Sequence, residues 1–77
     1  MITLSSLPIN SYGIIREIDL DKTTKLKLLE LGILSGVKIK LKNIAPLGDP
    51  ISIQIKGQAT FISISKKVAI KIFVTPV

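Results

Sequence analysis

The chain has 77 residues and a mass of 8.4 kDa, and it contains neither cysteine nor histidine. A chain of this length buries only about 60% of the surface that its unfolded form exposes, so it builds one domain with one thin core. Aliphatic side chains must form that core, because 47% of the residues are apolar and only 4% are aromatic. The lack of cysteine excludes disulfides and thiolate-bound metal, and it indicates a reducing compartment.

Hydropathy and charge narrow the class of protein further. The mean hydropathy is high at +0.54, yet lysines or turn residues interrupt every apolar stretch before the roughly 18 residues that a membrane span needs. Residues 1–4 lack the basic start and long apolar run of a secretory signal, so we expect a cytoplasmic protein. The formal net charge of +6 suits nucleic acid, anionic lipid or an acidic protein face. Lysine on the solvent side of strands explains the charge equally well.

The first half of the chain predicts one strand and one helix. Residues 14–18 read as the strand. Residues 22–31 are rich in Lys, Leu and Glu, which favour a helix, with Asp21 as its N-cap and Gly32 in the left-handed position after its end.

The spacing of apolar residues predicts how this helix packs. Thr24, Leu28 and Leu31 fall on one face, which we expect to lie against the sheet. Leu26 and Leu29 lie off that stripe. They are either exposed for a protein contact or covered by the N-terminal segment.

The second half predicts three consecutive antiparallel strands. Apolar residues alternate with lysines over 37–42, and isoleucines alternate with polar residues over 51–56. Turn residues over 45–50 connect these two strands, and Lys56-Gly57 makes a tight reversal into a third strand over 58–63.

The chain ends, by the same reasoning, in a helical turn over 64–69 and a strand over 70–74 that Pro76 stops. About five short strands cannot bury both faces as an open sheet. Curling into a small barrel encloses the aliphatic side chains and protects the strand edges. The pattern therefore predicts a mainly β fold in a single domain spanning residues 1–77.

Three motifs stand in order along nearly the whole chain. They are Leu4-Ser5-Ser6-Leu7-Pro8 with Gly13, Leu28-Leu29-Glu30-Leu31-Gly32-Ile33 with Gly36, and Ala45-Pro46-Leu47-Gly48-Asp49-Pro50. Together they resemble the FeoA family, the ferrous iron transport proteins A. The resemblance implies an SH3-like β-barrel of about five to six strands with one short α-helix. It also implies a regulatory accessory role, without enzymatic activity, beside a membrane ferrous iron transporter that carries a cytoplasmic GTP-binding domain.

The chain departs from the family pattern at several places. Ser35 stands where the family often has proline, and Lys27 stands where arginine is common. Residues 64–69 lack the Arg and Glu of the family's LRxxEA stretch, which removes any partner contact made by that pair.

The residue inventory predicts no catalytic, cofactor or metal site. Serines and lysines are scattered without the spacing of an activated nucleophile, and no phosphate-cradling glycine pattern is present. Asp19 and Asp21 offer hard oxygen ligands, but helix entry and capping explain them more economically. The full set of acids is Glu17, Asp19, Asp21, Glu30 and Asp49.

Three surfaces are candidates for binding a partner: the helix, the lysine face of the strand over 37–42, which Lys56 extends across the hairpin, and the loop over 45–50. In the loop, turn geometry alone also explains the residues. The candidate residues are Lys25, Leu26, Lys27 and Leu29 on the helix, Lys38, Lys40 and Lys42 on the strand, and Leu47 and Asp49 in the loop.

Our leading hypothesis is a cytoplasmic regulatory module that docks on the membrane iron transporter and so resides at the inner face of the membrane. The alternative is a small basic nucleic-acid-binding barrel. Two Phe, one Tyr, no Trp and a single Arg are few groups for stacking on bases or reading them, so we expect no nucleic-acid partner. We also expect no small-molecule substrate, and an exposed barrel edge permits weak self-association.

Overall fold

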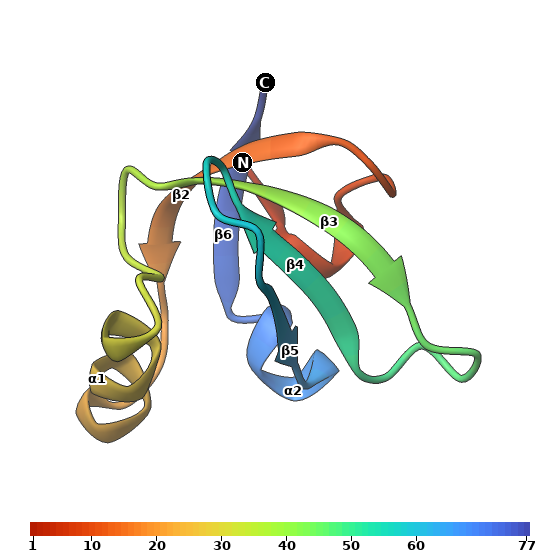
Figure 1. Ribbon diagram of the computed structural model, residues 1–77. Coiled ribbons are helices and arrows are strands. Elements are labelled where there is room, and N and C mark those ends of the chain that lie inside the picture. The colour runs from red at the N-terminus through yellow and green to blue at the C-terminus, as the bar shows by residue number, and fades with distance from the viewer.

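The computed structural model describes all residues, 1–77, as one strongly curved antiparallel sheet with short helices at its margins (Figure 1). The strands lie in the order β1-β6-β2-β3-β4-β5, so β3, β4 and β5 form the consecutive antiparallel strands expected from the sequence. In chain order the elements are β1 (Ile2–Thr3), a 3-10 helix (Leu4–Ser6), β2 (Tyr12–Ile18), α1 (Lys22–Glu30), β3 (Lys38–Ile44), β4 (Ile51–Ile55), β5 (Phe61–Ile64), α2 (Lys66–Ala69) and β6 (Ile72–Pro76).

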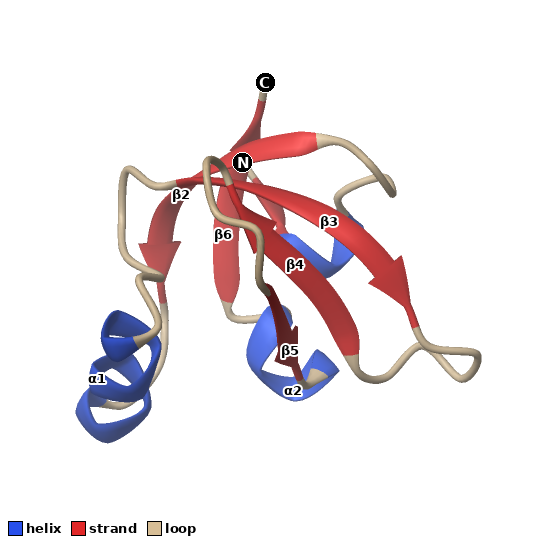
Figure 2. Cartoon of the chain, viewed as in Figure 1, coloured by secondary structure: helices blue, strands red, loops and turns tan.

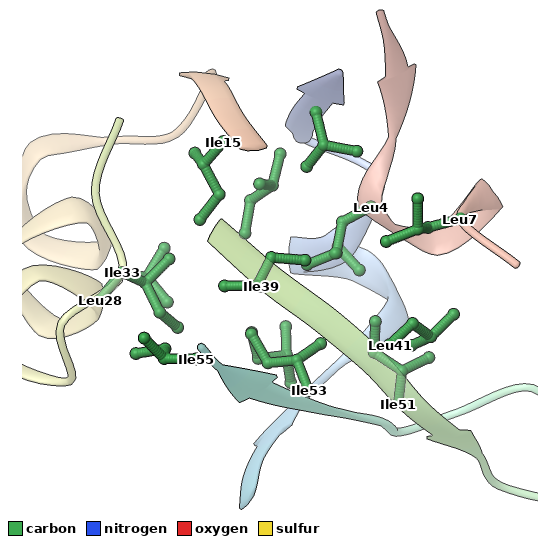
Figure 3. Packing of buried hydrophobic residues seen from close by; sticks show 14 residues of the cluster. Leu4, Leu7, Ile15, Leu28, Ile33, Ile39, Leu41, Ile51, Ile53 and Ile55 are labelled. Atoms are coloured by element: carbon green, nitrogen blue, oxygen red, sulfur yellow. The ribbon is translucent and has the colours of Figure 1, made fainter. Parts of the chain in front are cut away.

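The core is purely aliphatic and lies inside the curve of the sheet (Figure 3). Alternation places Ile39 and Leu41 of β3 inward, opposite Ile55 and Ile53 of β4, as the period of two predicts. The cluster contains 14 buried residues, and no polar or charged side chain is buried with them.

Gly13 allows β2 and β6 to approach each other closely. A Cβ at this position would lie 3.2 Å from both Cβ and Cγ2 of Val74, and 3.4 Å from Cδ2 of Leu7. Val74 and Leu7 are both core residues that cannot move aside cheaply. A side chain at Gly13 would therefore strain the core.

α1 begins as predicted but ends one residue earlier, because Leu31 forms its C-cap, and one packing prediction is wrong. The helix begins after Asp21 and ends at Glu30, and Gly32 has φ +88°. Leu31 is 50% exposed and not packed on the sheet. The reason is the turn after the helix, in which the Ile33 amide donates to the Leu28 carbonyl at 2.9 Å and so brings the Ile33 side chain into the core.

The last two strands begin later than predicted. β5 starts at Phe61 and not at residue 58, because Gln58 continues the turn by donating its amide to the Ile55 carbonyl at 3.0 Å. β6 starts at Ile72 and not at residue 70, because Ile70 forms the C-cap of α2. β6 also runs through Pro76, two residues beyond the predicted end.

The N-terminal segment contributes structure that the sequence patterns did not predict. β1 pairs with β6, and the 3-10 helix buries Leu4, with Leu7 buried just after it. Both leucines belong to the core cluster. None of the helices has the length and apolar character that crossing a membrane requires.

Candidate functional site

Helix α1 lies beside the curved sheet and projects away from it (Figure 2). Leu28 is its one buried residue, and it contacts the end of the core near Ile33 and Ile55 (Figure 3). The other faces of the helix are open to solvent along most of their length. α1 is therefore attached to the barrel along a single narrow line.

The start of α1 is held by Asp21. Its Oδ2 accepts a hydrogen bond from the Thr24 amide at 3.2 Å, and its Oδ1 accepts one from the Thr24 hydroxyl at 2.6 Å. The hydroxyl bond and then the amide bond hold the pKa of the Asp21 carboxyl below its usual value. This confirms the capping role expected for Asp21, and no cluster of three or more acidic side chains gathers at any point of the structure.

The solvent side of α1 carries exposed leucines. Leu26 and Leu29 are 50% and 49% exposed, so the alternative in which the N-terminal segment covers them is wrong. Leu31 and Leu34 are similarly exposed just beyond the helix. Of these four leucines, Leu29 and Leu34 line the same groove.

A shallow groove of about 570 Å³ lies between α1 and the end of β2. Its apolar lining includes Leu29, Leu34 and the buried Ile33, and charged side chains of both signs also line it. The turn that forms one wall is tied to β2, because the Ser35 hydroxyl donates to the Arg16 carbonyl at 3.0 Å. The lining residues are Arg16, Glu17, Ile18, Asp19, Leu20, Lys25, Leu29, Ile33, Leu34 and Ser35.

The lysines of β3 lie on the outer face of the sheet, as predicted from their alternation. The ammonium groups of Lys38 and Lys40 stand 5.1 and 5.0 Å from the centre of the Tyr12 ring. Lys42 stands 5.8 Å from the centre of the Phe61 ring. At these distances each ammonium is attracted by the face of the ring, so the three lysines are partly ordered by the sheet itself.

The β3–β4 loop, residues 45–50, is tied to the start of α2. Asp49 Oδ1 accepts a hydrogen bond from the Lys66 amide at 2.9 Å, which gives Asp49 a structural role between two elements. Leu47 makes no comparable contact, and it is 95% exposed. Within this loop, Leu47 is the residue without a structural explanation.

The structure thus divides the candidate residues between two sides of the molecule. Lys25, Leu26, Lys27 and Leu29 share α1, on one side of the barrel, while the β3–β4 loop lies on the other side (Figure 1). Leu34 and the groove wall from β2 were not predicted. The only indication of the groove in the sequence was Leu34, an apolar residue in the turn after the helix.

Comparison with known families agrees with the motifs. The FeoA domain family matches residues 2–76. The chain belongs to the FeoA family. This family consists of accessory proteins and is not a known family of enzymes, and membership indicates a role in ferrous iron transport.

Solved FeoA structures share the fold. The FeoA protein from Chlorobium tepidum is 27% identical, with a TM-score of 0.88 over 97% of this chain and 70% of its own. Iron(II) transport protein A from Clostridium thermocellum is 30% identical, with a TM-score of 0.89 over 99% of this chain and 46% of its own. Among curated proteins, none matches this FeoA-family chain.

More distant structures support the fold alone. Stenotrophomonas maltophilia FeoA, solved with zinc and described as an SH3 domain protein, is 24% identical, with a TM-score of 0.77 over 97% of this chain and 91% of its own. A manganese-dependent transcriptional repressor is 17% identical, with a TM-score of 0.85, over 97% of this chain and 36% of its own. The predicted mainly β, SH3-like fold is confirmed.

Proposed function

We propose that this FeoA-family protein is a cytoplasmic accessory protein that regulates ferrous iron transport by docking on the cytoplasmic side of the membrane GTPase iron transporter. The observation that supports this proposal most strongly is the surface of α1. Leu26 and Leu29 on the helix, and Leu31 and Leu34 just beyond it, are 41 to 50% exposed, and Leu29 and Leu34 line the groove. A protein with so thin a core would gain stability by burying these leucines in its own fold. Their exposure therefore supports a surface that a partner protein covers.

The groove also defines the kind of partner segment that fits. Arg16 and Lys25 can pair with acidic side chains, and Glu17 and Asp19 with basic ones, around an apolar floor. A segment with one or two apolar anchors flanked by charges of both signs therefore complements it. Apolar anchors at the centre with a polar rim are the common anatomy of protein interfaces.

The required area is compatible with the size of the molecule. A specific interface buries about 800 Å² per partner. The whole protein exposes 4670 Å², so docking covers about one sixth of its surface. The exposed side of α1, the groove and the turn after the helix together offer an area of this kind on one side.

The test is a pull-down and titration of the transporter's cytoplasmic GTP-binding domain with the wild-type protein and with Leu26→Glu. We expect the wild-type protein to bind and Leu26→Glu to bind at least about tenfold more weakly. The substitution removes the exposed half of the leucine surface from the interface, and it forces a carboxylate to lose its hydration. Ile9→Glu is the matched control, because Ile9 is also half-exposed but lies beside β3 and not beside α1. The amide of the next residue, Asn10, donates a hydrogen bond to the carbonyl of Leu41 in β3.

A second variant decides between the helix and the strand face. Lys38→Glu/Lys40→Glu/Lys42→Glu reverses the charge on β3 and leaves α1 unchanged, so we expect it to bind within about threefold of wild type if docking uses α1. Failure of the wild-type protein to bind would refute direct docking. Loss confined to the β3 variant would refute the assignment to α1.

A further inference from the structure

The charges of this chain are divided unevenly between its two halves. Residues 1–36 contain four cationic side chains, Arg16, Lys22, Lys25 and Lys27, and four acidic ones, so their formal net charge is zero. Residues 37–77 contain seven lysines and a single acid, Asp49, so they carry the whole net charge of +6. Not all of this charge lies away from α1, because Lys67 and Lys71 line a pocket beside Asp21 and Thr24 at the start of that helix. The lysines on the outer face of β3, together with Lys66 beside the β3–β4 loop, form the group away from α1 that attracts an anionic partner.

One of these lysines, Lys66, lies beside the exposed β3–β4 loop, and another, Lys42, precedes the loop on β3. The hydrogen bond from the Lys66 amide to Asp49 fixes the β3–β4 loop against α2, and the Lys66 ammonium lies 4.0 Å from where a side chain on Gly48 would begin. Lys42, near the base of the same loop, lies over the exposed ring of Phe61. We name Lys42, Leu47, Phe61 and Lys66 the basic tip.

We propose that the basic tip binds the surface of an anionic lipid bilayer. Leu47 enters the boundary between headgroups and acyl chains, and Lys42 and Lys66 remain at the level of the lipid phosphates. At the surface of a bilayer, apolar side chains are buried below the headgroups, while long cationic side chains extend back up to them. The exposed Leu47 at the end of its loop, with lysines nearby, fits this arrangement.

The same residues fit a bilayer better than a nucleic acid. Binding to single strands depends on aromatic rings that stack on bases. Here Lys38 and Lys40 lie over the Tyr12 ring, Phe73 is partly buried, and Phe61 is the one largely exposed ring, so no row of rings is present on which successive bases could stack. The exposed Leu47 side chain adds nothing to the binding of a polyanion, whereas insertion into a membrane interface requires an apolar side chain of this kind.

The position of the basic tip leaves α1 free. α1 and the β3–β4 loop lie on opposite sides of the barrel (Figure 1), and the molecule is 29 Å across in its longest direction. Because the Debye length is about 10 Å at 0.1 M salt, the charges of α1 contribute little to binding at the tip. Contact with a bilayer is therefore independent of contact with a protein at α1.

The test is sedimentation of the purified protein with vesicles of phosphatidylcholine containing about 30% phosphatidylglycerol, against vesicles of phosphatidylcholine alone, at about 0.1 M salt. We expect binding to the anionic vesicles only. Lys42→Gln/Lys66→Gln should weaken it about 25-fold, at about fivefold per lysine. Leu47→Ala should weaken it about tenfold.

The controls separate the tip from net charge and from polyanion binding in general. Lys22→Gln/Lys25→Gln removes the same charge from α1 and should change vesicle binding by less than about twofold. A single-stranded oligonucleotide should bind more weakly than the anionic vesicles, with no effect of Leu47→Ala. Circular dichroism should show all variants folded, because none of the substituted side chains belongs to the core.

Any one of five results would overturn the proposal. The protein fails to sediment with anionic vesicles, or sediments equally with neutral ones. Leu47→Ala binds as tightly as wild type. The α1 control loses as much binding as Lys42→Gln/Lys66→Gln. The oligonucleotide binds more tightly than the vesicles, which would assign the basic side to nucleic acid. Because the vesicles contain no protein, none of these results bears on docking through α1.

Discussion

Replacing Leu28 by alanine should loosen α1 while leaving the barrel folded. Leu28 is 6% exposed and is the only buried residue of the helix, and it lies at one end of the core beside Ile33 and Ile55 (Figure 3). Core Leu→Ala substitutions cost about 2–5 kcal/mol, and a site next to solvent relaxes well, so we expect about 2 kcal/mol here. A domain of this length has a free energy of unfolding of about 4–12 kcal/mol, so the variant remains folded.

Urea unfolding followed by circular dichroism measures this loss, and native-state hydrogen exchange locates it. The amides of α1 should lose protection first, because no other buried contact holds the helix. Leu26→Ala is the matched control on the same helix. It makes the same chemical change at a half-exposed position and should cost less than about 1 kcal/mol. Equal losses for the two variants, or equal loss of protection in β3 and α1, would refute the view that Leu28 alone anchors the helix.

Two further predictions concern Gly13 and Asp21. Gly13→Ala should lower the free energy of unfolding by about 1–3 kcal/mol, since its Cβ would lie 3.2 Å from Val74; a urea midpoint equal to or above wild type would contradict this. The folded-state pKa of Asp21 is lowered by its bonds to Thr24, so this cap stabilises α1 above the unfolded pKa, and the contribution is lost as the pH falls through the lowered folded value. The Thr24 amide resonance should therefore shift in acid below about pH 4, and Asp21→Asn should abolish that titration; an unchanged titration in the variant would refute the assignment.

Local patterns were sufficient to predict much of the core. Ile39, Leu41, Ile51, Ile53 and Ile55 were all expected to point inward, and all are buried. The reason is that side chains of a strand alternate between its faces whatever the strand pairs with. The helix ends were also predictable, because capping by Asp21 and the positive φ of Gly32 depend on a few neighbouring residues.

Features that depend on distant residues were not predictable in this way. The helical stripe of Thr24, Leu28 and Leu31 assumes a helix lying flat on the sheet, but α1 projects from it and buries Leu28 alone. The groove depends on the same placement, since one wall comes from β2 and the other from α1. The burial of Leu4 was missed because the 3-10 helix that contains it has only three residues and shows no hydrophobic period.

The exposed leucines of α1 are the strongest physical reason to expect a partner. A helix of nine residues is too short to be stable alone in water, and here its cap, its C-terminal turn and Leu28 hold it against the barrel. Rotating the helix to bury Leu26 and Leu29 would raise the free energy of unfolding by about 1 kcal/mol or more per leucine. The fold lacks that stabilisation and leaves these apolar side chains in water near a groove with charges of both signs. Nothing in the stability of the monomer accounts for this arrangement, whereas a partner that covers α1 does.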